Sequence, residues 1–247
     1  MGNTLHFFPE TESTNTLAFR LADEGAKEGT AVIADSQTQG RGRIKRKWES
    51  PPGLNLYTSL ILKPDINPAR SSPITLTAGV AVAELFSLYC PGKVHLKWPN
   101  DVLINGRKVC GILTEIKTEG KKLKFIILGV GININMKRAD FPPPLEEIAT
   151  SLREETGHTV SRVKVAAGLY EILDKFYNIF LKEGFSSIRE LWLAYSQMSG
   201  KYVEVTCGGE ISRGKVTGID DGGALILQGE NGRSQRVIAG DASLVRV

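Results

Sequence analysis

Cysteine is scarce in this sequence, and the cysteines present stand far apart. Cys90, Cys110 and Cys207 form an odd, dispersed set among 247 residues. A disulfide framework needs paired cysteines, and a structural zinc site needs clustered ligands. The sequence therefore argues against both, and it favours a reducing cytoplasm as the location of the protein.

Long hydrophobic runs are also missing. No apolar stretch approaches the roughly 20 residues that a helix needs to cross a bilayer. The segment from Met1 to Glu10 has neither a basic flank nor a long apolar core, so it does not resemble a secretory signal. His6 occupies the position at which a myristoylation signal requires Ser or Thr. We therefore expect no membrane attachment.

The common metal and phosphate motifs are absent as well. His6, His95 and His158 show no HExxH pattern or other ligand spacing, so we expect them to be structural or solvated. No GxxxxGK[ST] sequence occurs, which excludes a P-loop. The stretch 129–131 reads Gly-Val-Gly and lacks the third glycine of a dinucleotide fingerprint. The sequence thus predicts no metal site built by the protein alone.

The charge that is present is mildly positive and unevenly placed. Lys and Arg total 31 against 27 Asp and Glu, a formal net charge of +4. This balance permits an anionic ligand such as a nucleotide without requiring nucleic acid. Five cations fall within positions 41–47: Arg41, Arg43, Lys45, Arg46 and Lys47. Aromatic residues make up only 7%, and none form a stacking array among these cations.

Up to about residue 198, helical and strand patterns follow one another. The expected helices cover about 14–24, 73–89, 145–155, 162–182 and 186–195. The expected strands cover 30–34, 54–62, 94–98, 102–104, 108–117 and 124–135. Asn105-Gly106 is a strong signal for a two-residue hairpin, because both turn positions need positive φ. The fold class predicted for this part is α+β, with a mixed β-sheet and flanking helices.

The pattern changes after Gly200. The stretch from Lys201 to Val247 contains about five short strands separated by glycine-rich turns, and it has no helix-length pattern. Such a stretch is typical of a small β-barrel. We therefore predict two domains, 1–198 and 199–247.

Two segments carry residues suited to chemistry. The first, 40–48, reads GRGRIKRKW: its glycines let the backbone approach a ligand, and its arginines suit phosphate or carboxylate. Trp48 suits stacking on a purine or packing in the core. Taken alone, this segment is ambiguous: a basic loop is more often a solvated surface, and it also suits an anion-binding loop or a nucleic-acid patch.

The second segment surrounds the predicted hairpin. It places Lys97, Asn100 and Asp101 before the turn and Lys108 after it, at the start of an otherwise apolar strand. A lysine at a strand end is usually solvated. Lys108 also suits an ammonium that points into a pocket and holds an anion.

The order of these motifs resembles the biotin protein ligase family. Ser13-Thr14-Asn15, Gln37, GRGRxxRxW, KWPNDV, GRKxxGIL and Gly129-x-Gly131-Ile132-Asn133 follow one another along the chain. The resemblance extends from about Ser13 into the expected barrel. It implies a class II aminoacyl-tRNA synthetase-like fold, followed by a small SH3-like β-barrel.

The resemblance also implies roles for individual residues. Those matching biotin-binding positions are Ser13, Thr14, Asn15, Gln37, Gly40, Arg41, Gly42, Arg43, Lys108, Gly111 and Gly131. Those matching nucleotide-binding positions are Arg43, Arg46, Trp48, Lys97, Asn100 and Asn133. Those assigned to catalysis are Lys108, Arg43 and Asp101.

The implied activity is ATP-dependent ligation. Biotin is activated as biotinyl-5'-AMP, with Mg²⁺ carried on the phosphates of ATP, and is then transferred to a lysine of a biotin carboxyl carrier protein such as that of acetyl-CoA carboxylase. A homodimer is compatible with the family, and no nucleic-acid partner is expected. A lipoate ligase or octanoyl transferase of the same fold, and a basic nucleic-acid-binding module, are the alternatives.

The sequence departs from the family pattern at two places. The family usually reads GRGRxGRxW, but Lys45 replaces the second loop glycine, so we expect a backbone that is less permissive in φ and ψ. The added charge would also suit contact with phosphate. Only about a dozen residues precede Ser13, which leaves no room for the winged helix-turn-helix that some members carry.

Overall fold

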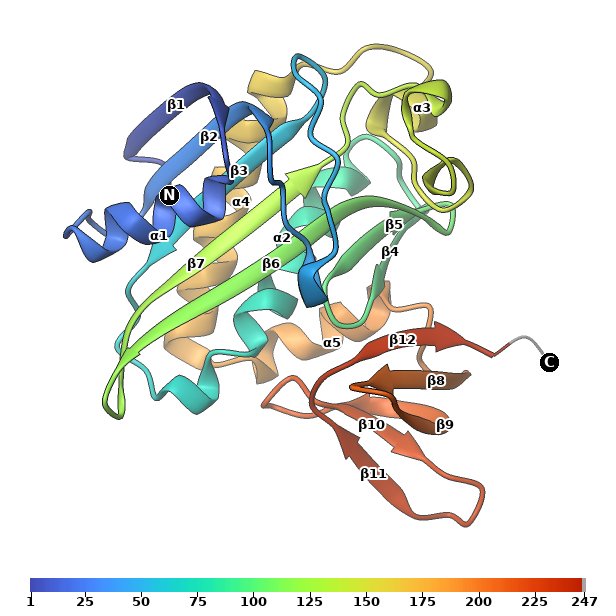
Figure 1. The fold of residues 1–247 in the computed structure, drawn as a ribbon. Coiled ribbons are helices and arrows are strands. Elements are labelled where there is room, and N and C mark those ends of the chain that lie inside the picture. The colour runs from blue at the N-terminus through green and yellow to red at the C-terminus, as the bar shows by residue number, and fades with distance from the viewer. Residues whose placement is uncertain (246–247) are drawn as a thin grey trace.

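The chain folds into two β-sheets, of which the first and larger carries most of the helices (Figure 1). The computed structural model describes residues 1–245, except for the side chain of Lys45. Arg246 and Val247, the last residues of the predicted second domain, lie outside the described residues. No described helix combines the length and the apolar character needed to cross a membrane.

The first sheet has seven strands in the order β1-β2-β3-β7-β6-β5-β4. Its strands are β1 (Thr4–Thr11), β2 (Thr30–Gln37), β3 (Leu56–Leu62), β4 (Val94–Lys97), β5 (Asp101–Ile104), β6 (Arg107–Glu119) and β7 (Lys122–Ile132). β1 pairs with β2 in parallel, and the other pairs are antiparallel. The mixed sheet with flanking helices that the sequence predicts is confirmed.

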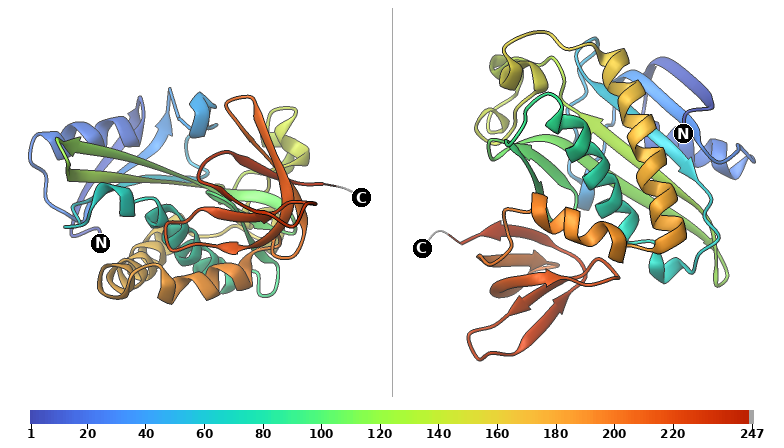
Figure 2. Two further views of the ribbon diagram at one scale, coloured as in Figure 1. Left: turned by 90° about the horizontal axis from the view of Figure 1, so that it is seen from below. Right: turned by 180° about the vertical axis from the view of Figure 1, so that it is seen from behind.

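Helices cover the two faces of this sheet unequally. α1 (Thr14–Asp23) lies alone on one face, and α2 (Pro73–Ser87), α4 (Arg162–Glu183) and α5 (Ser186–Tyr195) cover the other (Figures 1 and 2). The main core lies between the sheet and these three helices, and a smaller cluster lies under α1. The face that carries α1 is therefore not covered by α2, α4 or α5.

Local signals explain the longest helix. α4 begins after Ser161, whose hydroxyl accepts a hydrogen bond from the Lys164 N–H, and it ends before Gly184, which has a φ of 82°. Apolar residues recur along it at helical spacing and are buried: Val165, Leu169, Leu173, Phe176 and Phe180.

Two features of residues 1–198 differ from what the sequence suggests. β1 was not expected, because its pattern is mostly exposed and its Leu5 and Phe7 side chains face solvent. The single helix predicted over 145–155 is wrong. The chain instead forms a 3₁₀ turn at Leu145–Glu147 and the short α3 at Leu152–Thr156. Between them the backbone bonds to Lys108, whose N–H donates to the Ile148 carbonyl and whose carbonyl accepts from Thr150.

The second sheet is antiparallel and has the order β11-β10-β9-β8-β12. Its strands are β8 (Tyr202–Cys207), β9 (Glu210–Ile219), β10 (Leu225–Gln228), β11 (Ser234–Val237) and β12 (Asp241–Leu244). It packs beside α5 and the β4–β5 edge of the first sheet (Figure 1). A buried hydrogen bond joins the two sheets: Trp98 Nε1 donates to the Gly223 carbonyl at 3.0 Å.

Candidate active site

One large cavity lies on the face of the first sheet that carries α1. Its volume is about 570 Å³, and its walls are the N-terminus of α1, the loop after β2, the β4–β5 turn, β6, β7 and the segment after β7. Of the predicted site residues, all except Gly40 line it: Ser13, Thr14, Asn15, Gln37, Arg41, Gly42, Arg43, Arg46, Trp48, Lys97, Asn100, Asp101, Lys108, Gly111, Gly131 and Asn133.

One end of the cavity is lined by hydroxyl and amide groups. The Thr14 N–H and Oγ1 both donate to Gln37 Oε1, at 2.9 and 3.2 Å. The Ser59 hydroxyl lies 2.8 Å from Thr14 Oγ1 and 2.6 Å from Asn15 Oδ1. Because Thr14 opens α1, its backbone N–H has no acceptor within the helix and needs one such as Gln37. This end therefore offers both donors and acceptors in a buried setting.

Glu115 joins this polar end to the basic loop. Its Oε2 accepts a hydrogen bond from Asn15 Nδ2 at 2.8 Å and forms an ion pair with Arg41 Nη2 at 3.0 Å. Glu115 lies on β6 in the stretch that follows Gly111. Glu115 stands two residues beyond the GRKxxGIL motif and was assigned no role from the sequence, because its partners depend on the packing of the sheet.

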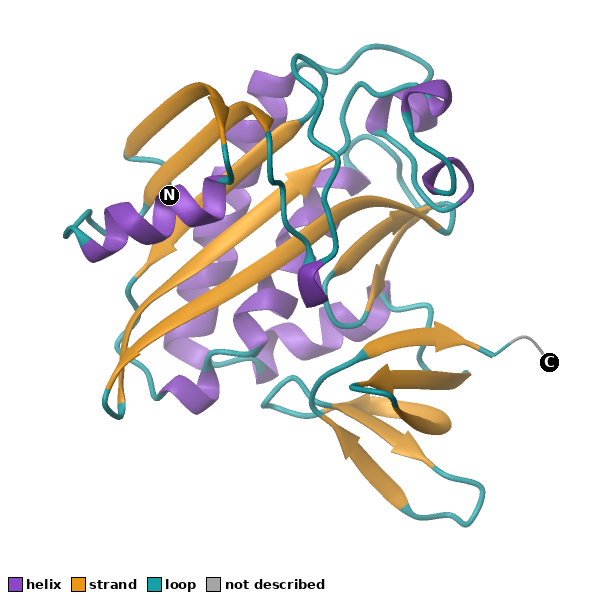
Figure 3. Cartoon of the chain, in the orientation of Figure 1, coloured by secondary structure: helices purple, strands orange, loops and turns teal. Residues whose placement is uncertain are grey.

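The basic loop folds back on itself above the sheet (Figure 3). Arg41 and Lys47 form an antiparallel bridge, and the Gly42 N–H donates to the Arg46 carbonyl at 2.7 Å. The tip is a 3₁₀ turn, Arg43–Lys45, in which Ile44 has a φ of 53°. The loop is thus an ordered hairpin with one non-glycine residue in the left-handed region.

Two positions of the loop differ from what the sequence suggests. Gly40 is not among the lining residues of the cavity, and an added Cβ there would lie 2.4 Å from the Trp48 carbonyl oxygen, so close packing requires glycine at this position. Its assignment to biotin binding stays a prediction. The left-handed residue of the tip is Ile44, one position before Lys45. The expected contact of Lys45 with phosphate lies outside the described residues.

Arg43 reaches from the loop tip to groups on both sheets. Its Nη1 lies 3.3 Å from Asn100 Oδ1, 3.2 Å from the Gly240 carbonyl and 3.5 Å from Asp241 Oδ1. Arg46 forms an ion pair with the same Asp241 carboxylate. Asp241 was not anticipated, since it lies in the second sheet and in no recognised motif.

Glycines on two neighbouring strands form the floor. Gly111 of β6 and Gly131 of β7 face each other across the ladder, and the indole of Trp48 packs on both. An added Cβ would lie 2.8 Å from the indole at Gly111 and 2.7 Å from it at Gly131, so only glycine fits. Trp48 Nε1 is buried and has no hydrogen-bond partner among the described residues.

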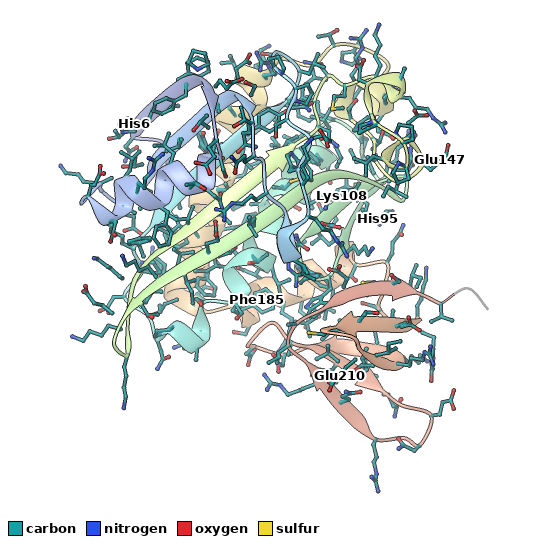
Figure 4. The ribbon with its side chains drawn as sticks, in the orientation of Figure 1. His6, His95, Lys108, Glu147, Phe185 and Glu210 are labelled. Carbon is teal, nitrogen blue, oxygen red and sulfur yellow. The ribbon has the colours of Figure 1, made fainter. Side chains whose placement is uncertain are left out.

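Lys108 lies at the start of β6, beside the basic loop (Figure 4). Its Nζ lies 2.6 Å from Asp101 Oδ1 and 5.3 Å from the centre of the Trp48 ring. The adjacent Cys110 thiol is fully buried, and this burial raises its pKa far above its ordinary value. The thiol is therefore unsuited to act as a nucleophile, whereas the ammonium reaches the cavity.

The segment after β7 covers the far side of the cavity. The Asn133 side chain donates to the Thr150 carbonyl at 3.0 Å, which holds the end of this segment against the sheet. The segment supplies apolar lining residues: Met136, Phe141, Leu145, Ile148 and Ala149. Sequence reasoning did not assign them to the site, because an apolar run with prolines carries no signal that distinguishes a cavity wall from a core.

The comparisons with known proteins agree with this geometry. The model of the biotin/lipoate A/B protein ligase family matches residues 7–133, and that of the biotin protein ligase C-terminal domain matches residues 198–245. The chain belongs to the biotin protein ligase family.

Individual relatives support this membership in a biotin protein ligase family. The chain is 39% identical to the bifunctional ligase/repressor BirA of Bacillus subtilis over 94% of this chain and 71% of that protein. It is 34% identical to the biotin–[acetyl-CoA-carboxylase] ligase of Paracoccus denitrificans over 90% of this chain and 93% of that one. The Aquifex aeolicus biotin protein ligase in complex with biotin and ATP superimposes with a TM-score of 0.84 at 29% identity, covering 99% and 100% of the two chains.

The acidic groups of this biotin protein ligase do not form a metal cluster in the part of the chain that the structure describes. Among those residues, no three His, Cys, Asp or Glu side chains are close enough together to hold an ion. His6 and His95, for example, lie on the strands at opposite edges of the first sheet (Figure 4). A divalent ion bound here would take most of its ligands from a nucleotide's phosphates and from water.

Proposed function

We propose that the cavity binds biotin and ATP side by side and condenses them to biotinyl-5'-AMP. The chain is an ATP-dependent biotin protein ligase that transfers the biotinyl group to a lysine of another protein. One observation carries the assignment of the site: a buried polar end and a cationic loop open into the same cavity, with the Lys108 ammonium at its floor.

The polar end suits the ureido ring of biotin. A ureido group presents both N–H donors and a carbonyl acceptor, and leaving a buried polar group unpaired costs about 1–3 kcal/mol. The hydroxyls of Ser13 and Thr14 and the amides of Asn15 and Gln37 provide complementary groups. Because Gln37 is already fixed by Thr14 and by Ser50, this end is arranged before biotin arrives.

Lys108 suits the reacting carboxylate of biotin. The carboxylate oxygen attacks the α-phosphorus of ATP, the bond to the β,γ-diphosphate breaks, and pyrophosphate leaves. Both reactants are anions that repel each other, so the protein's contribution is positioning and charge neutralisation. The ammonium of Lys108 and the guanidinium of Arg43 both line the cavity and would oppose that negative charge.

The nucleotide would lie toward the loop and the β4–β5 turn. The groups that favour this placement are Arg43, Arg46, Trp48, Lys97, Asn100 and Asn133. Mg²⁺ bound to the phosphates supplies further charge neutralisation for the departing pyrophosphate. The scarcity of clustered carboxylates in the described cavity fits an ion that enters with ATP.

Asp101 suits the second half-reaction. The acceptor lysine must lose a proton before its amine can attack the acyl carbon and release AMP. Asp101 lies beside the cavity with its Oδ1 against Lys108 Nζ, within reach of a group that approaches the acyl–phosphate bond from the β4–β5 side. We assign it the role of orienting that amine or accepting its proton.

The carrier that we propose is a biotin carboxyl carrier protein of acetyl-CoA carboxylase. The support is that relatives such as the Paracoccus denitrificans protein bear the name biotin–[acetyl-CoA-carboxylase] ligase. We further propose a cytoplasmic location, since the cysteines are free and two of them are buried. A homodimer and the domain division at residue 198 remain proposals. The division is supported by the interval between α5, ending at Tyr195, and β8, beginning at Tyr202.

Calorimetry and exchange kinetics test the function together. We expect biotin to bind alone, to bind more tightly with an ATP analogue present, and to support ATP–pyrophosphate exchange with Mg²⁺. Lipoate in place of biotin should neither bind nor support ATP–pyrophosphate exchange. Exchange driven by lipoate, or salt-sensitive DNA binding without any biotin turnover, would overturn the proposal.

A further inference from the structure

A single carboxylate of the second sheet holds two arginines of the basic loop. Asp241 opens β12, and its two carboxylate oxygens contact Arg43 and Arg46. The neighbouring Gly240 carbonyl accepts a further hydrogen bond from Arg43 at 3.2 Å. These contacts join residues up to 198 positions apart in the chain, at the mouth of the cavity.

The backbone that presents Asp241 is firmly placed. Asp241 pairs with Thr206 in the β12–β8 ladder. Gly240 has a φ of 134°, and a Cβ there would lie 2.6 Å from Val205 Cγ1 and 2.8 Å from the Thr206 carbonyl oxygen, so only glycine fits. The side chains of Asp241 and Arg43 are 27% and 25% exposed, so water screens this pair only partly.

The other side of the loop has a separate attachment. Arg41 is paired with Glu115 on β6, which fixes the start of the loop to the first sheet. The tip, by contrast, depends on Asn100 and on Gly240 and Asp241. Removing the Asp241 charge would leave Arg46 without its carboxylate partner and Arg43 with neutral acceptors only. The tip would then move away from the sheet more readily.

We propose that Asp241 is a positioning residue that keeps the basic loop over the cavity and so retains the acyl-adenylate. This inference rests on the proposed function. Asp241 is an anion near the place proposed for phosphate, so its own charge opposes nucleotide binding. Its benefit therefore lies in holding the loop after the adenylate has formed, rather than in binding ATP.

The escape rate of the adenylate tests this proposal. Enzyme, radiolabelled biotin, ATP, Mg²⁺ and pyrophosphatase form the intermediate, and the complex is separated from excess ligand. Release is then followed without carrier in the presence of hydroxylamine, which converts freed biotinyl-5'-AMP to the hydroxamate and AMP. For Asp241→Asn we expect release roughly three- to tenfold faster than in the wild type, with a KM for ATP that is unchanged or lower.

Matched variants separate positioning from a general effect on the fold. Asp241→Glu, which keeps the charge, should restore release to within about twofold of the wild type. Glu204→Gln removes a carboxylate from the same sheet, where it pairs with Arg213 away from the loop, and should change nothing. Because Asp241 acts through both arginines, adding Arg46→Gln to Asp241→Asn should speed release by a smaller factor than Arg46→Gln does in the wild type.

Each outcome has a defined meaning. If a folded Asp241→Asn variant released the adenylate at the wild-type rate, the inference would be overturned and the ligase function would stand. Release that rises together with the KM for ATP and with a lowered melting temperature would also overturn it, because that pattern indicates structural damage. Should Asp241→Asn not fold, unchanged release from Arg46→Gln would overturn it. A wild type that forms no adenylate would refute the proposed function instead.

Discussion

At the scale of single residues, the centre of the site is the pair formed by Lys108 and Asp101. Their side chains are in contact at 2.6 Å. The two residues lie on neighbouring strands, Asp101 before the Asn105-Gly106 turn and Lys108 after it. We assign the two groups to different half-reactions, Lys108 to adenylate formation and Asp101 to transfer. Substitutions at these positions should therefore affect different steps.

Replacing Lys108 with alanine tests the first assignment. The backbone of Lys108 is bonded to Ile148 and Thr150, and these bonds do not depend on its side chain, so the fold should persist. We expect ATP–pyrophosphate exchange to fall by at least about a hundredfold, because a group that neutralises charge in the transition state is lost. Lys121→Ala, at the exposed β6–β7 turn, is the control. Wild-type exchange in Lys108→Ala would refute the assignment.

Arg43 makes a second residue-scale prediction. Arg43→Gly removes the side chain that joins the loop tip to Asn100 and to the second sheet. The adenylate should escape roughly tenfold faster, because charge-assisted hydrogen bonds are lost, and it should acylate lysines of bystander proteins. Mass spectrometry of biotinylated lysines in a mixture of the carrier and an unrelated protein measures this loss of selectivity. Unchanged carrier selectivity would contradict the prediction.

At the scale of secondary-structure elements, the hairpin of β6 and β7 provides the floor of the site. Its two facing glycines, Gly111 and Gly131, accept the Trp48 indole in the space where other residues would carry side chains. This packing fixes one end of the basic loop against the sheet. The position of the loop therefore depends on the absence of side chains on two strands.

Gly131→Ala should disturb this packing. Its Cβ would lie 2.7 Å from the indole, and relieving such overpacking costs about 1–3 kcal/mol. We expect Trp48 to shift, with a changed tryptophan fluorescence spectrum, weaker biotin binding and a lower melting temperature. Gly218→Ala is a matched strand control, since a Cβ there meets no atom within 4 Å. Equal behaviour of the two variants would show that the indole does not rest on Gly131 in solution.

Local sequence patterns predicted most elements but not those that tertiary contacts decide. The Asn105-Gly106 turn has φ values of 50° and 79°, as its composition requires. β1 escaped prediction because an exposed, parallel edge strand lacks the alternation that burial imposes. The helix predicted over 145–155 does not form as one unit, because the Lys108 backbone hydrogen-bonds to Ile148 and Thr150, on both sides of Ala149. Both errors depend on partners distant in the chain.

At the scale of the whole molecule, the junction between the two sheets contains a titratable group. His95 lies on β4, near the end of α5 at Tyr195 and near Lys201. Burial is the main reason that its pKa lies below the ordinary value of 6.5, and the positive charge of Lys201 acts in the same direction. The folded protein therefore favours neutral His95.

This lowered pKa predicts a loss of stability in mild acid. Below about pH 6.5 the unfolded chain binds a proton at this histidine that the folded chain resists, so the free energy of unfolding falls as pH falls. The contribution is fully present above pH 6.5 and is lost as pH falls toward the folded pKa. Urea unfolding at pH 7.5 and 5.5 should show a smaller decrease for His95→Gln than for the wild type. An equal decrease in both would exclude His95 as the cause.

The composition of the cavity shows how far motifs alone can identify a site. Most lining residues belong to motifs that could be assigned by resemblance, and they meet in one cavity. Glu115 and Asp241 could not be assigned that way, because their importance comes from the arginines that they face. Facing partners depend on how the sheets pack, and no local pattern encodes that arrangement.

The contact between Arg43 and Asp241 also has a consequence during protein synthesis. A ribosome must add 198 further residues after Arg43 before the carboxylate at the mouth of the cavity exists. A nascent chain that has completed only the seven-stranded sheet would lack this attachment of its basic loop. If Asp241 positions the loop as we propose, its share in retaining the adenylate is added only once β12 has been synthesised.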